Sequence, residues 1–189
     1  LCAHFRGDDT AKLRGRLSLN PIKHIDPFMT IALPLFLFLS GSKVLFGGAK
    51  PVPVNPRNFK YPRFDFFLVA LAGPASNFLL AWLCGLAFSG IMHNAELGMA
   101  IVPHAPWLPS FLISLIISNV ALAVFNLTPV FPLDGGRMLM SLLPLSVSAR
   151  FEKYQYFGIA IVALLLSFPA YQIALEKAVI FGVSLFMKI

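Results

Sequence analysis

The sequence predicts an all-α membrane protein, a multi-pass helical bundle with short β-strands at the membrane surface. Two observations predict this class. First, 58% of the 189 residues are hydrophobic and only 12% are charged, whereas soluble domains are typically about 45–50% apolar and about 25% charged. Second, residues 66–95 contain no Asp, Glu, Lys or Arg, and about 20 apolar residues suffice for one helical span. The composition excludes a soluble enzyme and a disordered chain.

The charge balance fits the same class. Fifteen Lys and Arg against eight Asp and Glu give a net charge of +7. In a membrane protein such an excess is typical of basic loops on the cytoplasmic face, next to membrane lipid, so we expect no nucleic-acid partner. The two cysteines, Cys2 and Cys84, do not form a C-x-x-C pair, and neither a disulfide framework nor a cysteine zinc cluster is expected.

The first 42 residues contain one surface segment and one apolar segment. Residues 1–26 are polar and basic, and the alternation of polar and apolar residues across 16–20 predicts a short strand. Residues 27–42 are uncharged, but as a helix they would reach only about 24 Å, less than the hydrocarbon core of about 30 Å. Pro34 also interrupts this run. The segment therefore either re-enters the membrane or spans it, and the sequence leaves both open.

The next segment, residues 43–65, is basic again. Val52 and Val54 alternate with prolines in it. Proline cannot donate to a central ladder, so any strand here is expected at a sheet edge.

Three membrane helices are predicted after this segment, over residues 66–90, 108–127 and 154–175. Gly73-Pro74 lies inside the first and is expected to loosen it locally. A Pro- and Gly-rich turn and a short apolar stretch occupy residues 128–153. The tail, 178–187, is too short to span the membrane by itself.

One acidic residue stands apart from the other seven. Asp134 is the sole acid between Glu96 and Glu152, and it follows a predicted membrane helix. The prolines and glycines around it permit irregular backbone; they are Pro129, Pro132, Gly135 and Gly136. Two interpretations remain open. The carboxylate could line a wet cavity and ligate a cation such as zinc, or it could cap the next helix in a tight turn outside the bilayer.

Four motifs in this sequence resemble those of a known family. The run Asn126-x-x-Pro129-x-x-Pro132-Leu133-Asp134-Gly135-Gly136 resembles the second signature of the site-2 proteases, the intramembrane zinc metalloproteases. Residues 15–26, 48–58 and 72–77 (Ala-Gly-Pro-Ala-Ser-Asn) are similar to motifs of the small bacterial branch that lacks appended soluble domains. The resemblance extends over about residues 1–145 and includes Gly73, Pro74 and Asn77. Residues 154–189 carry no motif.

The resemblance implies an enzyme that hydrolyses peptide bonds of transmembrane peptide or protein substrates in a bacterial inner membrane. Members of the family hold one Zn²⁺ with two His of an H-E-x-x-H helix and one later Asp, which matches Asp134. The Glu of that helix is the general base. Asn126 would lie near the site and hydrogen-bond the substrate or the developing oxyanion; an interhelical hydrogen bond is the alternative for this residue.

This sequence departs from the family in one respect, because no H-E-x-x-H occurs in its 189 residues. We expect residues 1–189 to form a single membrane-embedded peptidase domain truncated at its N-terminus. It would comprise the end of the metal helix and surface segments (1–65), the core helices (66–145) and a C-terminal helical segment (146–189). Without two zinc ligands and the base, the chain as given is expected to be inactive. None of the four histidines forms an i, i+4 pair around a Glu, and none is expected to bind zinc: His4, His24, His93 and His104.

Two further roles are left as hypotheses. The segment of Val52 and Val54 could hold an extended substrate by strand addition, and its alternative is a structural hairpin at the membrane surface. Asn77 is expected to make a polar helix-packing contact, with a direct catalytic role as the alternative. For the whole protein, a non-catalytic membrane binding or scaffold homologue on the same fold is the main rival. A transporter would need inverted repeats or several intramembrane charges, which this sequence lacks.

Overall fold

The computed structural model describes residues 1–18, 20–40, 47–50, 52–144, 147 and 157–187. Within these residues the secondary structure is helical, and no strand occurs. The chain divides into two compact units, Leu1–Asp65 and Phe66–Ile189.

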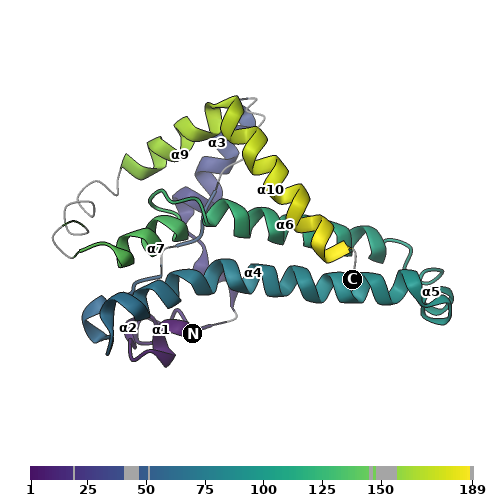
Figure 1. Cartoon of the computed structure of the whole chain (residues 1–189), viewed down its shortest axis with the longest axis horizontal. Helices are drawn as coiled ribbons and strands as arrows, with labels where there is room; N and C mark the ends of the chain where they lie inside the picture. Colours follow the sequence, from purple (N-terminus) through teal and green to yellow (C-terminus); the bar gives the residue numbers. More distant parts are fainter. Residues whose placement is uncertain (19, 41–46, 51, 145–146, 148–156, 188–189) are drawn as a thin grey trace. The chain divides into compact units, whose positions relative to one another are not determined.

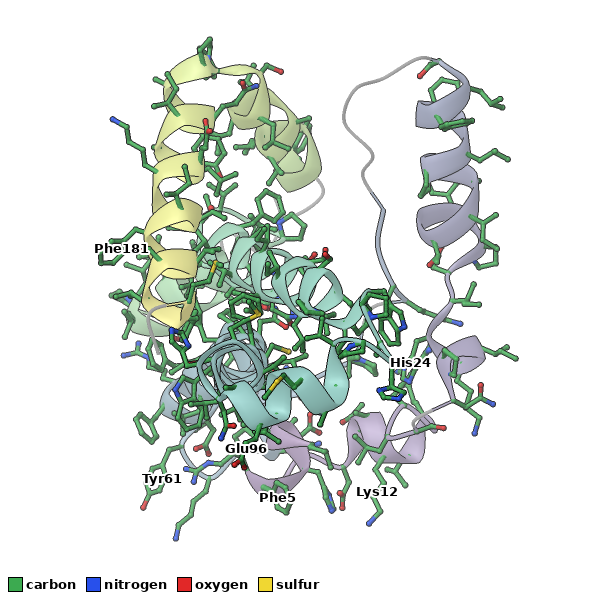
Figure 2. All side chains as sticks on the ribbon, turned by 90° about the vertical axis from the view of Figure 1, so that its right-hand side faces the viewer. Phe5, Lys12, His24, Tyr61, Glu96 and Phe181 are labelled. Atoms are coloured by element: carbon green, nitrogen blue, oxygen red, sulfur yellow. The ribbon has the colours of Figure 1, made fainter. Side chains whose placement is uncertain are left out.

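The first unit consists of short helical segments joined by turns. They are α1 (Cys2–Phe5), α2 (Thr10–Leu13), the 3₁₀-helix η1 (Pro21–His24), the π-helix η2 (Pro27–Ala32), α3 (Leu33–Leu39) and the 3₁₀-helix η3 (Pro56–Asn58). Three labelled side chains of this unit, Phe5, Lys12 and Tyr61, project outward in Figure 2. The apolar run predicted at 27–42 is helical over 27–39. Whether it spans or re-enters stays a prediction.

The strands predicted at the membrane surface are not formed in the described residues. Neither the alternating run before Asn20 nor the segment Val52–Asn55 is assigned to a strand, and Leu19 and Pro51 lie outside the described residues. Pro53 has no N–H to donate to a ladder. In the described part of the chain, no second extended segment pairs with these residues.

A buried carboxylate ties the first unit together. Asp8 is fully buried and accepts hydrogen bonds from the backbone N–H of Thr10 at 3.1 Å and of Asn55 at 2.8 Å. Its Oδ1 also accepts from Nδ2 of Asn58 at 2.8 Å. Burial alone would raise the pKa of the Asp8 carboxyl, but the hydrogen bonds from Thr10, Asn55 and Asn58 outweigh it and hold the pKa below its ordinary value.

A second buried acid makes a similar connection. Asp65, in the first turn of α4 (Pro62–His93), is fully buried. Its Oδ1 accepts from Nε of Arg6 at 2.7 Å, and its Oδ2 accepts from the backbone N–H of Tyr61 at 2.9 Å. These bonds tie the turn after α1 to the start of α4.

We expect Asp8→Ala to destabilise the first unit by about 3 kcal/mol, because it leaves buried donors unsatisfied. Asp9→Ala is the matched control: Asp9 is exposed and pairs with His4 at the surface, so we expect a loss of about 1 kcal/mol at most. The free energy of unfolding in mixed micelles measures both. Because the folded pKa of Asp8 is depressed, its contribution is present above about pH 4 and is lost as the pH falls through the folded pKa. Equal losses in the two variants would contradict this role.

The second unit contains α4 from Phe66 onward and the helices that follow it. These are α5 (Ala95–Ile101), α6 (Leu108–Asn126), α7 (Asp134–Leu142), α9 (Gly158–Ser167) and α10 (Pro169–Met187) (Figure 1). Three of them, α4, α6 and α10, are long and apolar enough to cross a membrane. Their core brings together α4 and α6 through six buried side chains: Ala81, Cys84, Ile91, Leu112, Ile116 and Val120. Phe181 of α10 instead points outward (Figure 2) and is 66% exposed, as expected of a side chain that faces lipid.

The predicted boundaries of the last membrane helix are wrong. Residues 154–156 of the expected 154–175 helix lie outside the described residues. The structure breaks the rest of that helix at Phe168, which is extended (φ −85°, ψ 119°), and Figure 1 shows α9 and α10 meeting there at an angle. A residue before proline is driven out of the helical region, while proline itself suits the first position of a new helix. The membrane-length helix is therefore Pro169–Met187. It includes the tail, 178–187, which is too short to span the membrane by itself.

Candidate functional site

The motif around Asp134 forms a loop between two helices. Helix α6 ends at Asn126, and α7 begins at Asp134. We call residues 127–133 between them the Asp134 loop. Its backbone is shaped by local hydrogen bonds, from the N–H of Val130 to the carbonyl of Thr128 at 2.8 Å and from the N–H of Leu133 to the carbonyl of Val130 at 2.9 Å. The result is a compact turn that delivers Asp134 as the first residue of α7.

The two glycines after Asp134 allow α7 to pack closely on this loop. A Cβ built at Gly135 would lie 2.2 Å from the carbonyl oxygen of Leu127. At Gly136 it would lie 2.6 Å from the backbone nitrogen of Phe131. Both glycines are buried. The Gly-Gly pair is therefore required for the close approach of two backbone segments.

The carboxylate of Asp134 reaches the first membrane helix at Gly73. A Cβ at Gly73 would lie 2.6 Å from Oδ2 of Asp134. Pro74, beside it, is fully buried inside α4. Two motifs separated by about 60 residues in the sequence thus meet at one carboxylate. A bulkier side chain at Gly73 would occupy the space that this carboxylate uses.

Asp134 does not cap α7. The N-cap residue is Leu133, and no side chain caps this helix. The carboxylate, which is half-buried, accepts no hydrogen bond from any other residue that the structure describes. Arg137, one turn further along α7, supplies the nearest complementary charge on that helix. Among the described residues, the carboxylate is therefore held by packing, beside Gly73, and not by a hydrogen bond.

Two other candidate residues lie on the helices that lead to this point. Nδ2 of Asn126 donates to the carbonyl of Leu122 at 3.0 Å within α6, so half of this amide is bound to its own helix. Asn77 is half-buried one turn after Gly73, and therefore shares its helix face. Its side-chain amide makes no hydrogen bond to another described residue. Among the described residues, neither amide bonds a residue on another helix.

The described residues do not complete a zinc site. A catalytic zinc ion usually has three protein ligands, and no group of three or more His, Cys, Asp or Glu occurs among the residues that the structure describes. Asp134 can supply one oxygen. The histidines are engaged elsewhere: His4 pairs with Asp9, Nε2 of His24 bonds the Ser18 carbonyl at 2.8 Å, and the other two bond backbone carbonyls of their own chain segments. The residues present therefore fit one ligand of the metal and not the whole set.

The segment of Val52 and Val54 is anchored on both sides. Before it, the N–H of Lys50 donates to the carbonyl of His24 at 2.9 Å. After it, Asn55 is bound to Asp8. Val52 is 48% exposed, and the backbone groups of residues 52–54 make no hydrogen bond to any other described residue. Residues 52–54 therefore have no regular secondary structure, and among the described residues their backbone groups are unpaired.

Residues from the C-terminal helices also reach this site, although no sequence motif marks them. The hydroxyl groups of Thr128 and Tyr171 are 2.8 Å apart. A Cβ at Gly158 would lie 2.2 Å from the carbonyl oxygen of Phe131. A tyrosine near a helix end is typical of membrane interfaces, so the sequence alone gave no reason to pair it with Thr128.

Comparison with known proteins extends these observations. Residues 88–167 match the model of peptidase family M50. Over 167 residues the chain is 41% identical to "Putative zinc metalloprotease YwhC" of Bacillus subtilis (strain 168), covering 88% of this chain and 72% of that protein. It is 31% identical over 168 residues to "Putative zinc metalloprotease Rip2" of Mycolicibacterium smegmatis (strain ATCC 700084 / mc(2)155), covering 87% of this chain and 58% of that protein. No solved structure matches the chain significantly.

Proposed function

The chain belongs to peptidase family M50, the site-2 protease family, and from this premise we propose that the full-length protein is an intramembrane zinc metalloendopeptidase. It is a multi-pass protein of the bacterial cell membrane. Its proposed reaction is hydrolysis of peptide bonds in membrane-embedded or membrane-adjacent substrates. The single observation that carries the proposal is the half-buried Asp134 carboxylate, which meets Gly73 of a second motif without a hydrogen-bond partner in the described residues.

In this proposal Asp134 is one of three zinc ligands, and the two histidines and the general base come from an H-E-x-x-H that the 189 residues do not contain. A zinc ion held by these ligands would supply a nucleophile at neutral pH, because it would lower the pKa of a coordinated water to about 7. The chain's own contribution is to position a carboxylate in a low-dielectric environment. Asn126, at the end of α6, is proposed to donate a hydrogen bond to the substrate or to the developing oxyanion.

The substrate is proposed to add as a strand to residues 52–54. A helix hides its peptide bonds in its own hydrogen bonds, so a membrane substrate must be extended before it is cut. The backbone groups of residues 52–54, which bond no other described residue, can bind an extended chain. Pro53 restricts which groups donate, because it has no N–H.

A non-catalytic scaffold on the same fold is the second candidate. One observation favours it, namely that the described residues gather no set of three metal-binding side chains. Coding sequence for H-E-x-x-H in frame with Leu1 supports the enzyme, and a full-length protein without that motif supports the scaffold.

Cleavage of a helical transmembrane substrate by the full-length protein tests the proposal. We expect cleavage by the wild type and a fall of at least about 100-fold in Asp134→Asn, which keeps the shape of the side chain and removes its charge. Val52→Pro with Val54→Pro should also reduce cleavage, because it removes the N–H groups at both positions. The alanine pair at the same positions keeps these groups and is the control. Full activity in Asp134→Asn would refute the ligand role, and full activity in the proline pair would refute strand addition.

A further inference from the structure

We infer that Tyr171 is a positioning residue of the candidate site, whose hydroxyl holds the Asp134 loop in place through Thr128. The inference rests on the proposed function, because that loop carries the proposed zinc ligand. Tyr171 belongs to the last 36 residues, where the sequence has no family motif. The structure therefore gives a role at the site to a region that the motifs leave unexplained.

The inference is based on a hydrogen bond between Thr128 and Tyr171, which are 43 residues apart in the sequence. Oγ1 of Thr128 and the hydroxyl of Tyr171 are 2.8 Å apart, in a part-buried environment. Thr128 lies two residues after α6 ends and six residues before Asp134, and Tyr171 lies in the first turn of α10. The bond thus connects the loop to a different helix.

The other hydrogen bonds of the loop are local. The N–H groups of Leu127 and Thr128 donate to carbonyls of α6, those of Ala123 and Phe125, at 3.0 and 3.1 Å. The N–H of Arg137 in α7 donates to the carbonyl of Leu133 at 3.3 Å, and two further bonds join loop residues to one another. Among the described residues, these bonds connect the loop to α6 and α7, the helices on either side of it in the sequence, and not to any other helix. In the part of the chain that the structure describes, the Thr128–Tyr171 pair is the only side-chain hydrogen bond from residues 127–133 to another helix.

Helix α10 is itself well anchored, so it can serve as the fixed side of this bond. A Cβ at Gly182 would lie 2.7 Å from Cγ1 of Val120, which is fully buried in α6. A Cβ at Gly85 of α4 would lie 2.4 Å from the carbonyl oxygen of Phe186. These close approaches seat α10 on both of the other long helices. Through Tyr171, the Asp134 loop is therefore bonded to a helix that is itself packed on the core of the unit.

A zinc ligand binds best when its backbone is already in place, because ordering a loop on binding reduces affinity. Removing the phenol hydroxyl leaves the Thr128 hydroxyl without its partner and frees the loop from α10. The net value of one such hydrogen bond corresponds to about a fivefold change in an equilibrium constant. We therefore expect loss of the Tyr171 hydroxyl to weaken zinc binding at Asp134 by about that factor.

The test compares five variants of the full-length protein with the wild type, all purified in detergent. Tyr171→Phe and Thr128→Val each remove one hydroxyl, and the double variant removes both. Thr128→Ser keeps a hydroxyl and should restore the wild-type properties. Tyr61→Phe is the matched control, since Tyr61 is exposed and points outward (Figure 2).

Two readouts are measured on these forms, zinc affinity by chelator competition and amide hydrogen exchange of residues 127–134. We expect Tyr171→Phe and Thr128→Val each to raise the zinc dissociation constant about fivefold and to speed exchange in the loop by a similar factor. The double variant should be no worse than either single one, because both remove the same bond. Tyr61→Phe should change neither readout.

The outcomes separate this inference from the proposed function. Loop exchange that is unchanged in Tyr171→Phe, or additive losses in the double variant, would overturn the positioning role. Faster exchange in Tyr171→Phe with unchanged zinc affinity would overturn it too, since the bond would then be merely structural. If the wild type binds no zinc, the proposed function fails, and the exchange rates alone decide whether Tyr171 holds the loop.

Discussion

Gly135→Ala is expected to destabilise the second unit by about 3 kcal/mol or more, the upper range for overpacking. The added methyl group would lie 2.2 Å from the carbonyl oxygen of Leu127, 2.4 Å from its carbonyl carbon and 2.5 Å from the carbonyl oxygen of Thr128. All three are backbone atoms, so no side-chain rotation relieves the clash. Either α7 must move away from the Asp134 loop or the loop must be rebuilt.

Gly90→Ala provides the control for this variant. Gly90 lies in α4, and a Cβ built there has nothing within 4 Å. Because alanine is the better helix former by about 1 kcal/mol, Gly90→Ala should leave the free energy of unfolding unchanged or raise it. Unfolding in mixed micelles measures both variants. Similar stabilities for the two would show that α7 does not pack on the loop as described.

Gly73→Ala, unlike Gly135→Ala, is expected to lose most of the cleavage activity while the free energy of unfolding changes little. The added methyl group would lie 2.6 Å from Oδ2 of Asp134, the end of a side chain that can rotate away. The protein can therefore fold with the alanine in place, and helix α4 gains a better helix former. The Asp134 carboxylate, however, must leave its position. A displacement of about 1 Å can reduce catalysis about 100-fold.

The same change at Gly90 is again the control, now within the same helix. We expect Gly73→Ala to reduce cleavage by the full-length protein about 100-fold, while its unfolding free energy stays within about 1 kcal/mol of the wild type. Gly90→Ala should keep full activity. Wild-type cleavage by Gly73→Ala would mean that the carboxylate does not need the space beside Gly73.

The sequence predicts the parts of this fold that depend on hydrophobic length. The spans 66–90 and 108–127 are confirmed as α4 and α6, with slightly different ends. The last span is placed wrongly by the sequence, because the expected range 154–175 stops before the charged pair Glu176-Lys177, through which the helix continues. In the structure both residues are exposed on α10, where a long helix tolerates them. The strands failed for a different reason, since a strand needs a partner that local alternation does not reveal.

The site was predictable only where motifs mark it. The four motifs singled out Asp134, Gly73 and their neighbours, and the structure brings these two residues together. The sequence does not predict contacts that depend on tertiary packing, such as the Thr128–Tyr171 hydrogen bond. The sequence also does not predict that Asp8 is a buried hydrogen-bond acceptor, although an acid two residues before Thr10 is a recognisable turn signal. Its bonds to Asn55 and Asn58 depend on a fold that no local pattern describes.

The central claim is that Asp134 holds zinc, and the metal content of the full-length protein tests it most directly. We predict about one zinc per chain in the wild type and a loss of that zinc in Asp134→Asn, with Asp9→Asn, a change at an exposed surface acid, keeping the wild-type content. Full zinc content in a folded Asp134→Asn protein would contradict the ligand assignment.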